Sequence, residues 1–171
     1  MTITGTTRVF YILGDPVAQV RAPEVYNHLF QRHGIDAAMV PLKLPAAALT
    51  GFLDHGMKAE NIGGFLATIP HKAALCERLN PTDPVARIAH AVNAVKRHDD
   101  GRLEAALFDG IGFVKGLDHF GIAVKGQRVL VVGAGEHVER LEQPIQQLAA
   151  GVVDAHGLAE AIEPEHLASP I

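Results

Sequence analysis

Short apolar runs that alternate with helix-spaced segments are the feature that most constrains how this chain can fold. Three apolar runs are each followed by a stretch in which apolar residues recur every three or four positions. The runs are residues 9–13, 38–42 and 62–68, and the helical stretches are residues 23–32, 46–54 and 71–79. This alternation predicts an α/β fold with a mostly parallel sheet and helices on both faces.

The second half of the chain predicts a hairpin, a helix and one more strand. Residues 91–96 and 103–108 flank an Asp-Gly pair, which is typical of a tight hairpin turn. Residues 109–120 predict a helix, and residues 128–132 predict a strand that is apolar from Val129 onward. The glycine-bounded stretch 121–126 is the best candidate for a domain boundary, because a strongly apolar strand begins just after it.

Composition excludes several classes of protein. The chain has 171 residues, of which 48% are hydrophobic and 20% charged, which is typical of a soluble globular protein. A net charge of −4 gives no basic footprint, so we expect no nucleic-acid partner. Neither a membrane span nor a leader is evident, so we expect a cytoplasmic protein. The single cysteine, Cys76, and the absence of an HExxH motif predict neither a disulfide framework nor a metal site.

Residues 68–72, Thr-Ile-Pro-His-Lys, end one predicted strand and open a helix. Ligands of α/β proteins bind where strands end and helices begin. Lys72 falls in the first helical turn, where the helix dipole disfavours a cation, and such departures concentrate at functional sites. A general base is therefore one interpretation of Lys72, and a solvated surface lysine is the other.

Two further polar residues are candidates, one just after a predicted strand and one inside another. Asp109 follows an apolar strand and precedes Gly110, where an ordinary helix N-cap explains it without a ligand. Asn93 interrupts the apolar run 91–95, where asparagine is disfavoured. An inward-facing Asn93 needs a partner, which is either a ligand or the backbone at a β-bulge.

The apolar strand at 129–132 runs into Gly133-Ala134-Gly135, a turn that lets a pyrophosphate approach the backbone. The complete dinucleotide fingerprint also needs a third small residue, where this chain has Val138, and an acidic residue about 20 positions on, for which Asp154 is the candidate. A tight strand-to-helix turn without a nucleotide is the alternative, and the sequence favours it.

Taken together and in order, these segments resemble the shikimate/quinate dehydrogenase family. The resemblance covers roughly residues 7–135, and Thr-Ile-Pro-His-Lys is its strongest element. It rests on residues 14–23 (Gly-Asp-Pro-Val-Ala-Gln-Val-Arg-Ala-Pro), 68–72, 91–95 (Ala-Val-Asn-Ala-Val), Asp109-Gly110 with Gly112-Phe113, and 131–135 (Val-Val-Gly-Ala-Gly).

The resemblance implies an enzyme of aromatic amino acid biosynthesis that transfers a hydride between a ring hydroxyl of a small cyclic hydroxy acid and NADP or NAD. It implies a substrate-binding α/β domain at residues 1–121 and a Rossmann-type nucleotide-binding segment, incomplete here, at residues 122–171. By the resemblance, Lys72 and Asp109 are the catalytic pair and Thr68 and Asn93 contact substrate hydroxyls. Gly133, Ala134 and Gly135 would bind the cofactor.

Three departures from the family pattern qualify these expectations. Where the family carries Ser-x-Ser for the substrate carboxylate, this chain has Val20-Arg21-Ala22, and Leu66-Ala67 replaces a more polar pair before Thr68. After Gly135 only residues 136–171 follow, too few for a two-half Rossmann domain. The alternative to an impaired oxidoreductase is therefore a non-catalytic substrate-domain module that binds no cofactor.

The strand at 129–132 also bears on oligomeric state. Without most of a nucleotide-binding sheet, it presents an apolar edge that invites pairing with another chain. We expect a homodimer or an aggregation-prone chain, unless the predicted helix at 141–149 covers that strand.

Overall fold

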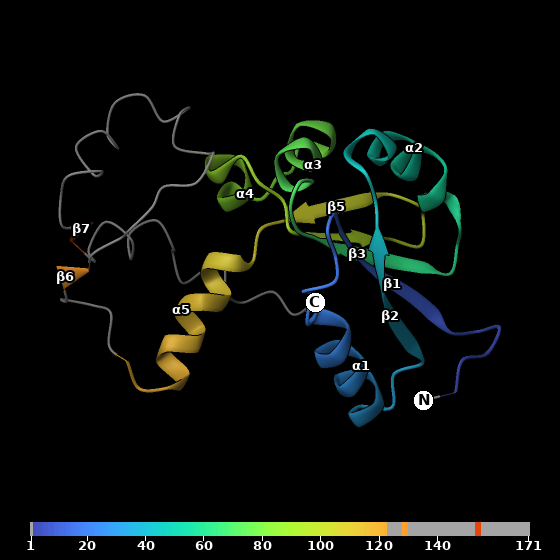
Figure 1. The fold of residues 1–171 in the computed structure, drawn as a ribbon, viewed down its shortest axis with the longest axis horizontal. Helices are drawn as coiled ribbons and strands as arrows, with labels where there is room; N and C mark the ends of the chain where they lie inside the picture. Colours follow the sequence, from blue (N-terminus) through green and yellow to red (C-terminus); the bar gives the residue numbers. More distant parts are fainter. Residues whose placement is uncertain (1, 123–127, 130–152, 155–171) are drawn as a thin grey trace. The chain divides into compact units, whose positions relative to one another are not determined.

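The computed structural model describes residues 2–122, 128–129 and 153–154 (Figure 1). The chain divides into two units, Met1–Phe108 and Asp109–Ile171. The elements of the first unit are β1 (Arg8–Gly14), α1 (Ala22–Arg32), β2 (Ala37–Lys43), η1 (Ala46–Ala48), α2 (Leu49–Asp54), η2 (Gly56–Lys58), β3 (Ile62–Ala67), α3 (Lys72–Leu79), α4 (Pro84–Ala89), β4 (Ala94–Arg97) and β5 (Leu103–Ala106). The described elements of the second are α5 (Asp109–His119), β6 (Arg128–Val129) and β7 (Val153–Asp154).

The division into units falls before α5, whereas the boundary expected from the sequence falls after it. The expected domain limits, 1–121 and 122–171, refer to substrate and nucleotide roles and stay a prediction. Within the residues that the structure describes, no helix is long and apolar enough to cross a bilayer.

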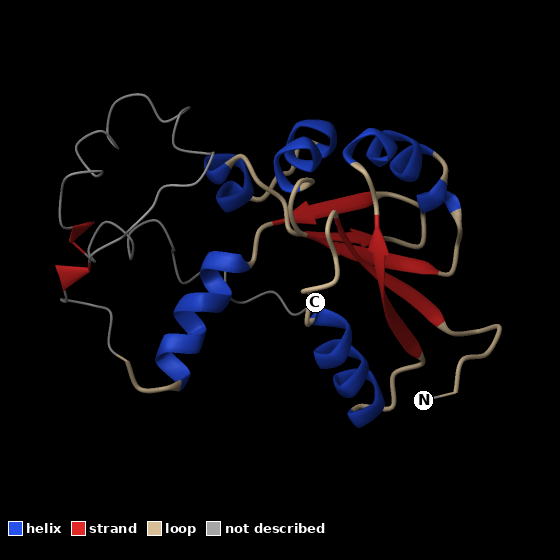
Figure 2. Cartoon of the chain, in the orientation of Figure 1, coloured by secondary structure: helices blue, strands red, loops and turns tan. Residues whose placement is uncertain are grey.

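A mixed five-stranded sheet, in the order β2-β1-β3-β4-β5, forms the centre of the first unit (Figure 2). β1 pairs parallel with β2 and with β3, as strand–helix–strand segments require. β4 pairs antiparallel with β3 and with β5, and its pairing with β5 is the hairpin that the sequence predicts. The α/β class is confirmed.

Alternation along β1 assigns its side chains to two faces of the sheet. Tyr11 packs against Phe52 of α2 with ring centroids 6.0 Å apart, and Leu13 lies in the main core with residues of α2, α3 and α4. Phe10 points to the other face and meets Phe30 of α1 at 5.7 Å. Helices therefore cover both faces, α2 to α4 on one side and α1 on the other (Figure 1).

The outer edge of β2 is occupied by a side chain of α1. The Asn27 amide donates to the Met39 carbonyl at 2.9 Å, and its oxygen accepts the Met39 N–H at 2.7 Å. Two residues along, Pro41 has no N–H to offer. Asn27 thus takes the two backbone groups that a neighbouring strand would otherwise bond.

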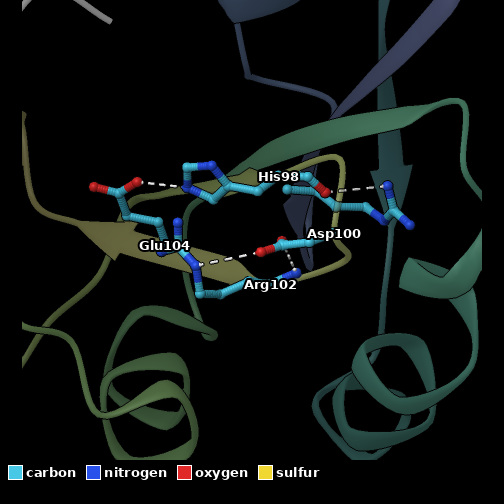
Figure 3. Close-up of polar contacts among 5 residues, drawn as sticks. His98, Asp100, Arg102 and Glu104 are labelled. Carbon is cyan, nitrogen blue, oxygen red and sulfur yellow. Dashed lines mark hydrogen bonds and ion pairs between the residues drawn. The ribbon is translucent and has the colours of Figure 1, made fainter.

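The β4–β5 hairpin turns at residues 98–101, where Gly101 has a φ of +85°. The Asp100 carboxylate accepts the Arg102 backbone N–H at 2.9 Å, and His98 Nε2 lies 2.7 Å from the Glu104 carboxylate (Figure 3). The hairpin predicted from Asp100-Gly101 is confirmed, although its strands are shorter than expected.

Helix α4 is the one element of the first unit's sheet-and-helix core that the sequence analysis missed. It begins at Pro84 after Asp83, a proline at the first helical position after a good N-cap residue. Its presence shortens the next strand, because β4 begins at Ala94 and residues 91–93 are not in it. Asn93 therefore precedes β4 rather than interrupting a strand, and β5 ends at Ala106 rather than at Phe108.

Candidate active site

The candidate site lies at one end of the sheet, where strands of both directions expose their ends. β1 and β3 finish there, and the antiparallel β4 begins there, since Leu66 and Ala106 both pair with Ala94. Gly14 is the last residue of β1, and Thr68 follows β3 at the corresponding position, because Leu13 pairs with Ala67. The carboxyl ends of parallel strands are where α/β proteins bind ligands.

Thr68 is fixed by the end of β1. Its backbone N–H donates to the Leu13 carbonyl at 2.9 Å, and the N–H of Asp15 donates to the Ile69 carbonyl at 3.0 Å. A Cβ added to Gly14 would lie 2.6 Å from Thr68 Cγ2. Glycine at position 14 therefore lets the threonine side chain settle against the turn, where Asp15–Pro16 and Ile69–Pro70 are both cis peptides.

Lys72 is the first residue of α3 and is half-buried. Its carbonyl accepts the N–H of Val92 at 3.0 Å, so the start of α3 is bonded to the residue before Asn93. The Asn93 carbonyl in turn accepts the N–H of Ala67 at 2.8 Å, next to Thr68. The segments that carry Lys72, Asn93 and Thr68 are thus bonded to one another through the backbone.

His71 is a residue of this end that the sequence analysis did not single out. It is the N-cap residue of α3, is buried, and its Nε2 lies 2.9 Å from the Leu44 carbonyl. A carbonyl only accepts, so Nε2 carries the proton. Nδ1 is buried and has no hydrogen-bond partner within the described part of the chain. His71 ties the start of α3 to the end of β2; no periodic pattern could have found it.

The Asn93 side chain has a backbone partner. The Oδ1 atom of Asn93 accepts the backbone N–H of Phe108 at 2.9 Å, and the backbone N–H of Asn93 donates to the Ala106 carbonyl at 3.1 Å. The expectation that an asparagine here needs a partner is met by the chain leaving β5. Contact with a substrate stays a prediction.

The segment at residues 20–22 begins α1, with Arg21 as its N-cap residue and no side-chain cap bond. Arg21 forms an ion pair with Glu24, and Lys43 at the end of β2 lies 3.6 Å from Asp15. Val20 and Ala22 have no side-chain donors. Arg21 and Lys43 thus each have a carboxylate partner already.

The remaining predicted residues lie in the second unit. Asp109 is the first residue of α5, and its proximity to Lys72 stays a prediction. Gly133, Ala134 and Gly135 lie outside the described residues. β6 and β7 pair antiparallel, with Arg128 opposite Asp154, whereas the strands of a Rossmann βαβ unit are parallel. Among the described residues no group of His, Cys, Asp and Glu could hold a metal ion.

A family model described as the shikimate dehydrogenase substrate binding domain matches residues 12–95. The match runs from β1 into β4 and includes Thr68, Lys72 and Asn93. It ends before Asp109.

Curated and solved relatives agree with that model. Shikimate dehydrogenase (NADP(+)) of Geobacter metallireducens is 39% identical over 136 residues, 79% of this chain and 47% of the relative. A crystal structure of a shikimate dehydrogenase with NADP+ has a TM-score of 0.73 and 32% identity, covering 78% of this chain and 46% of that one. A 5-ketofructose reductase of Gluconobacter sp. has a TM-score of 0.66 and 27% identity, covering 75% and 46%. The chain thus spans about half the length of the relatives it matches.

Proposed function

We propose, from the premise that this chain belongs to the shikimate dehydrogenase family, that its site binds a small cyclic polyol and that Lys72 exchanges a proton with a ring hydroxyl. One observation carries the proposal. The Lys72 carbonyl accepts the N–H of Val92, the residue before Asn93, and the Asn93 carbonyl accepts the N–H of Ala67, the residue before Thr68. An amine, an amide and a hydroxyl are thereby gathered at one end of the sheet. These groups suit a substrate with several hydroxyls.

Each residue has a role in this proposal. Lys72 takes the hydroxyl proton when the alcohol is oxidised and returns it when the ketone is reduced, with Asp109 as its partner. Thr68 and Asn93 hydrogen-bond neighbouring hydroxyls and so orient the ring. Proton transfer by a positioned side chain contributes about 10²- to 10⁴-fold to a rate.

NADP or NAD is the cofactor that the family implies, and it accepts or supplies the hydride. A complete dinucleotide site needs parallel strands around the glycine-rich turn. The antiparallel pairing of β6 with β7 does not fit that requirement. Cofactor binding at Gly133, Ala134 and Gly135 stays a prediction, and no step through a nucleotide is assigned to this chain.

A non-catalytic substrate-binding module is the second candidate, and the antiparallel β6–β7 pair favours it. In this case residues 1–108 keep the ligand site, and oxidation or reduction does not follow binding. Both candidates assume a cytoplasmic protein. The expected homodimer remains to be tested by sedimentation.

The substrate is expected to differ from shikimate in its charge. Hydrogen bonds to a charged group contribute about 1.5–3 kcal/mol each, and neither Val20 nor Ala22 can donate one. Arg21, which lies between them, is already ion-paired with Glu24. The fold neighbour that reduces 5-ketofructose, a sugar without a carboxylate, supports a substrate of lower charge.

Calorimetric titrations on the whole chain test the proposal and separate its two forms. Shikimate, quinate and an uncharged cyclic polyol are titrated first, and NADP and NAD are then titrated with and without the best of these ligands. Binding of both a polyol and NADP supports the oxidoreductase. Binding of a polyol without any binding of NADP or NAD at millimolar cofactor supports the module. If no polyol binds, the proposed function is wrong.

A further inference from the structure

Two consecutive backbone N–H groups after β5 are bonded by side chains instead of by a strand. The N–H of Leu107 donates to Asp83 Oδ2 at 2.9 Å, and the N–H of Phe108 donates to Asn93 Oδ1 at 2.9 Å. These are the last two residues before Asp109. Asp83 precedes α4 and Asn93 lies in the loop after it. They are 24 residues from Leu107 and 15 residues from Phe108 in the sequence, respectively.

The sheet offers these two donors no partner. Among the residues that the structure describes, β5 is an edge strand that pairs only with β4, and its last pair joins Ala106 to Ala94. Leu107 is nonetheless buried, at 8% exposure, and its bond to Asp83 is partly buried, whereas the bond of Phe108 is exposed. Buried backbone donors are almost always bonded, and here the acceptor is a carboxylate, which forms stronger hydrogen bonds than a neutral oxygen.

Asp83 has a second set of bonds that explains its presence before α4. As N-cap residue it accepts the N–H of Val85 on Oδ1 at 3.1 Å and the N–H of Ala86 on Oδ2 at 3.3 Å. An N-cap needs only one such oxygen, and serine serves as well as aspartate there. The bond from Oδ2 to Leu107 is therefore a property that capping alone does not require.

From this arrangement we infer that Asp83 is a positioning residue for Asp109. Its carboxylate joins the start of α4 to the chain leaving β5 and fixes the backbone two residues before Asp109. Asn93 fixes the next residue in the same way. This inference rests on the proposed function for the role of Asp109, whereas the bond to Leu107 can be tested without it.

Substitution to serine separates the two tasks of Asp83. In Asp83→Ser the single hydroxyl still caps α4, but no second oxygen remains for Leu107. Asp83→Ala removes both bonds. Asp100→Ser is the matched control, because Asp100 also accepts one backbone N–H, at the far end of the same hairpin.

The first measurement is residue-resolved amide exchange on the whole ¹⁵N-labelled chain. In Asp83→Ser we expect Leu107 to lose protection about tenfold, with altered shifts at Asp109 and Gly110, while the amides of α4 and the melting temperature stay near wild type. Asp100→Ser should leave Leu107 unchanged. Unchanged protection of Leu107 in Asp83→Ser, or equal loss in Asp100→Ser, overturns the inference.

The second measurement is turnover of the cyclic polyol that binds best, assayed with NADP. Misplacing Asp109 should lower kcat about tenfold in Asp83→Ser with little change in KM, which a merely structural role would not produce. A changed Leu107 amide with unchanged kcat also overturns the positioning role. Absence of ligand binding by the wild type contradicts the proposed function instead, and the exchange data then still decide whether Asp83 fixes the segment before Asp109.

Discussion

The two ends of the five-stranded sheet differ in the partners that their polar side chains bond. At the candidate site, Asp83 and Asn93 accept backbone N–H groups of the chain leaving β5. At the hairpin end the polar side chains bond one another near the surface: Arg8 with Asp99 at 3.9 Å, Arg102 with Asp100 at 4.0 Å and His98 with Glu104 at 2.7 Å, and Asp100 also accepts the Arg102 N–H. Exposed ion pairs contribute about 0–1 kcal/mol. We therefore expect substitutions of polar side chains to cost more stability at the candidate-site end than at the hairpin end.

The largest expected effect comes from removing Lys72. In Lys72→Ala, kcat should fall by about 10²- to 10⁴-fold while KM changes little, because proton transfer is lost and ring contacts remain. Steady-state kinetics with the best polyol and NADP measure this. Lys96→Ala on β4, an exposed lysine, is the control and should keep wild-type kcat. An unchanged kcat in Lys72→Ala would contradict the role given to it.

Filling the space at Gly14 should destabilise the site end. In Gly14→Ala the new Cβ meets Thr68 Cγ2 at 2.6 Å, and such overpacking costs about 1–3 kcal/mol. Urea unfolding measures the loss. Gly51→Ala in α2 is the matched control: its Cβ meets nothing within 4 Å, so the helix should gain up to about 1 kcal/mol. Equal stability of the two variants would show that the end of β1 is not closely packed.

Restoring hydroxyls before α1 should sharpen ligand preference. The double change Val20→Ser with Ala22→Ser should improve shikimate affinity at least about tenfold, the equivalent of roughly 1.4 kcal/mol, because two donors return to the carboxylate. Calorimetry with shikimate and its methyl ester measures this, and the ester should gain less. Micromolar shikimate binding by the unchanged chain would mean that other residues hold the acid.

The smallest effect is expected at the hairpin end, where Asp36 precedes β2. Hydrogen bonds from the hydroxyls of Thr7 and then Thr6, both at 2.7 Å, hold the pKa of Asp36 below its usual value. The folded pKa is thus below the unfolded one, so the stabilisation is present above about pH 4 and is lost as pH falls through the folded pKa. The Tm difference between wild type and Asp36→Asn should shrink below about pH 4. A difference independent of pH would contradict this.

Local patterns predicted most elements of the first unit. β1, α1, β2, β3 and α3 begin and end within two residues of the expected limits, because apolar periodicity and proline or glycine mark their ends. The hairpin followed from Asp100-Gly101. Helix α4 was missed although Asp83-Pro84 is an ordinary start signal, because it has only six residues and too few apolar positions to show a period.

The site was predictable only where a residue type is unusual for its element. Lys72 at a helix start and Asn93 in an apolar run drew attention on that ground. His71 and Asp83 did not, because their partners, Leu44 and Leu107, lie 27 and 24 residues away. Such bonds depend on which strands become neighbours, and local sequence does not determine that order.

The Asn27 bonds to Met39 bear on how two copies of the first unit could meet. A strand from a second chain that approached β2 would find the N–H and carbonyl of Met39 already taken, and no N–H at Pro41. Edge strands protected in this way resist sheet extension. In the first unit, growth by strand addition is therefore directed to β5, whose four residues include the charged Glu104. Two copies of the first unit that joined by sheet extension would therefore pair through β5, and no such pairing is expected at β2.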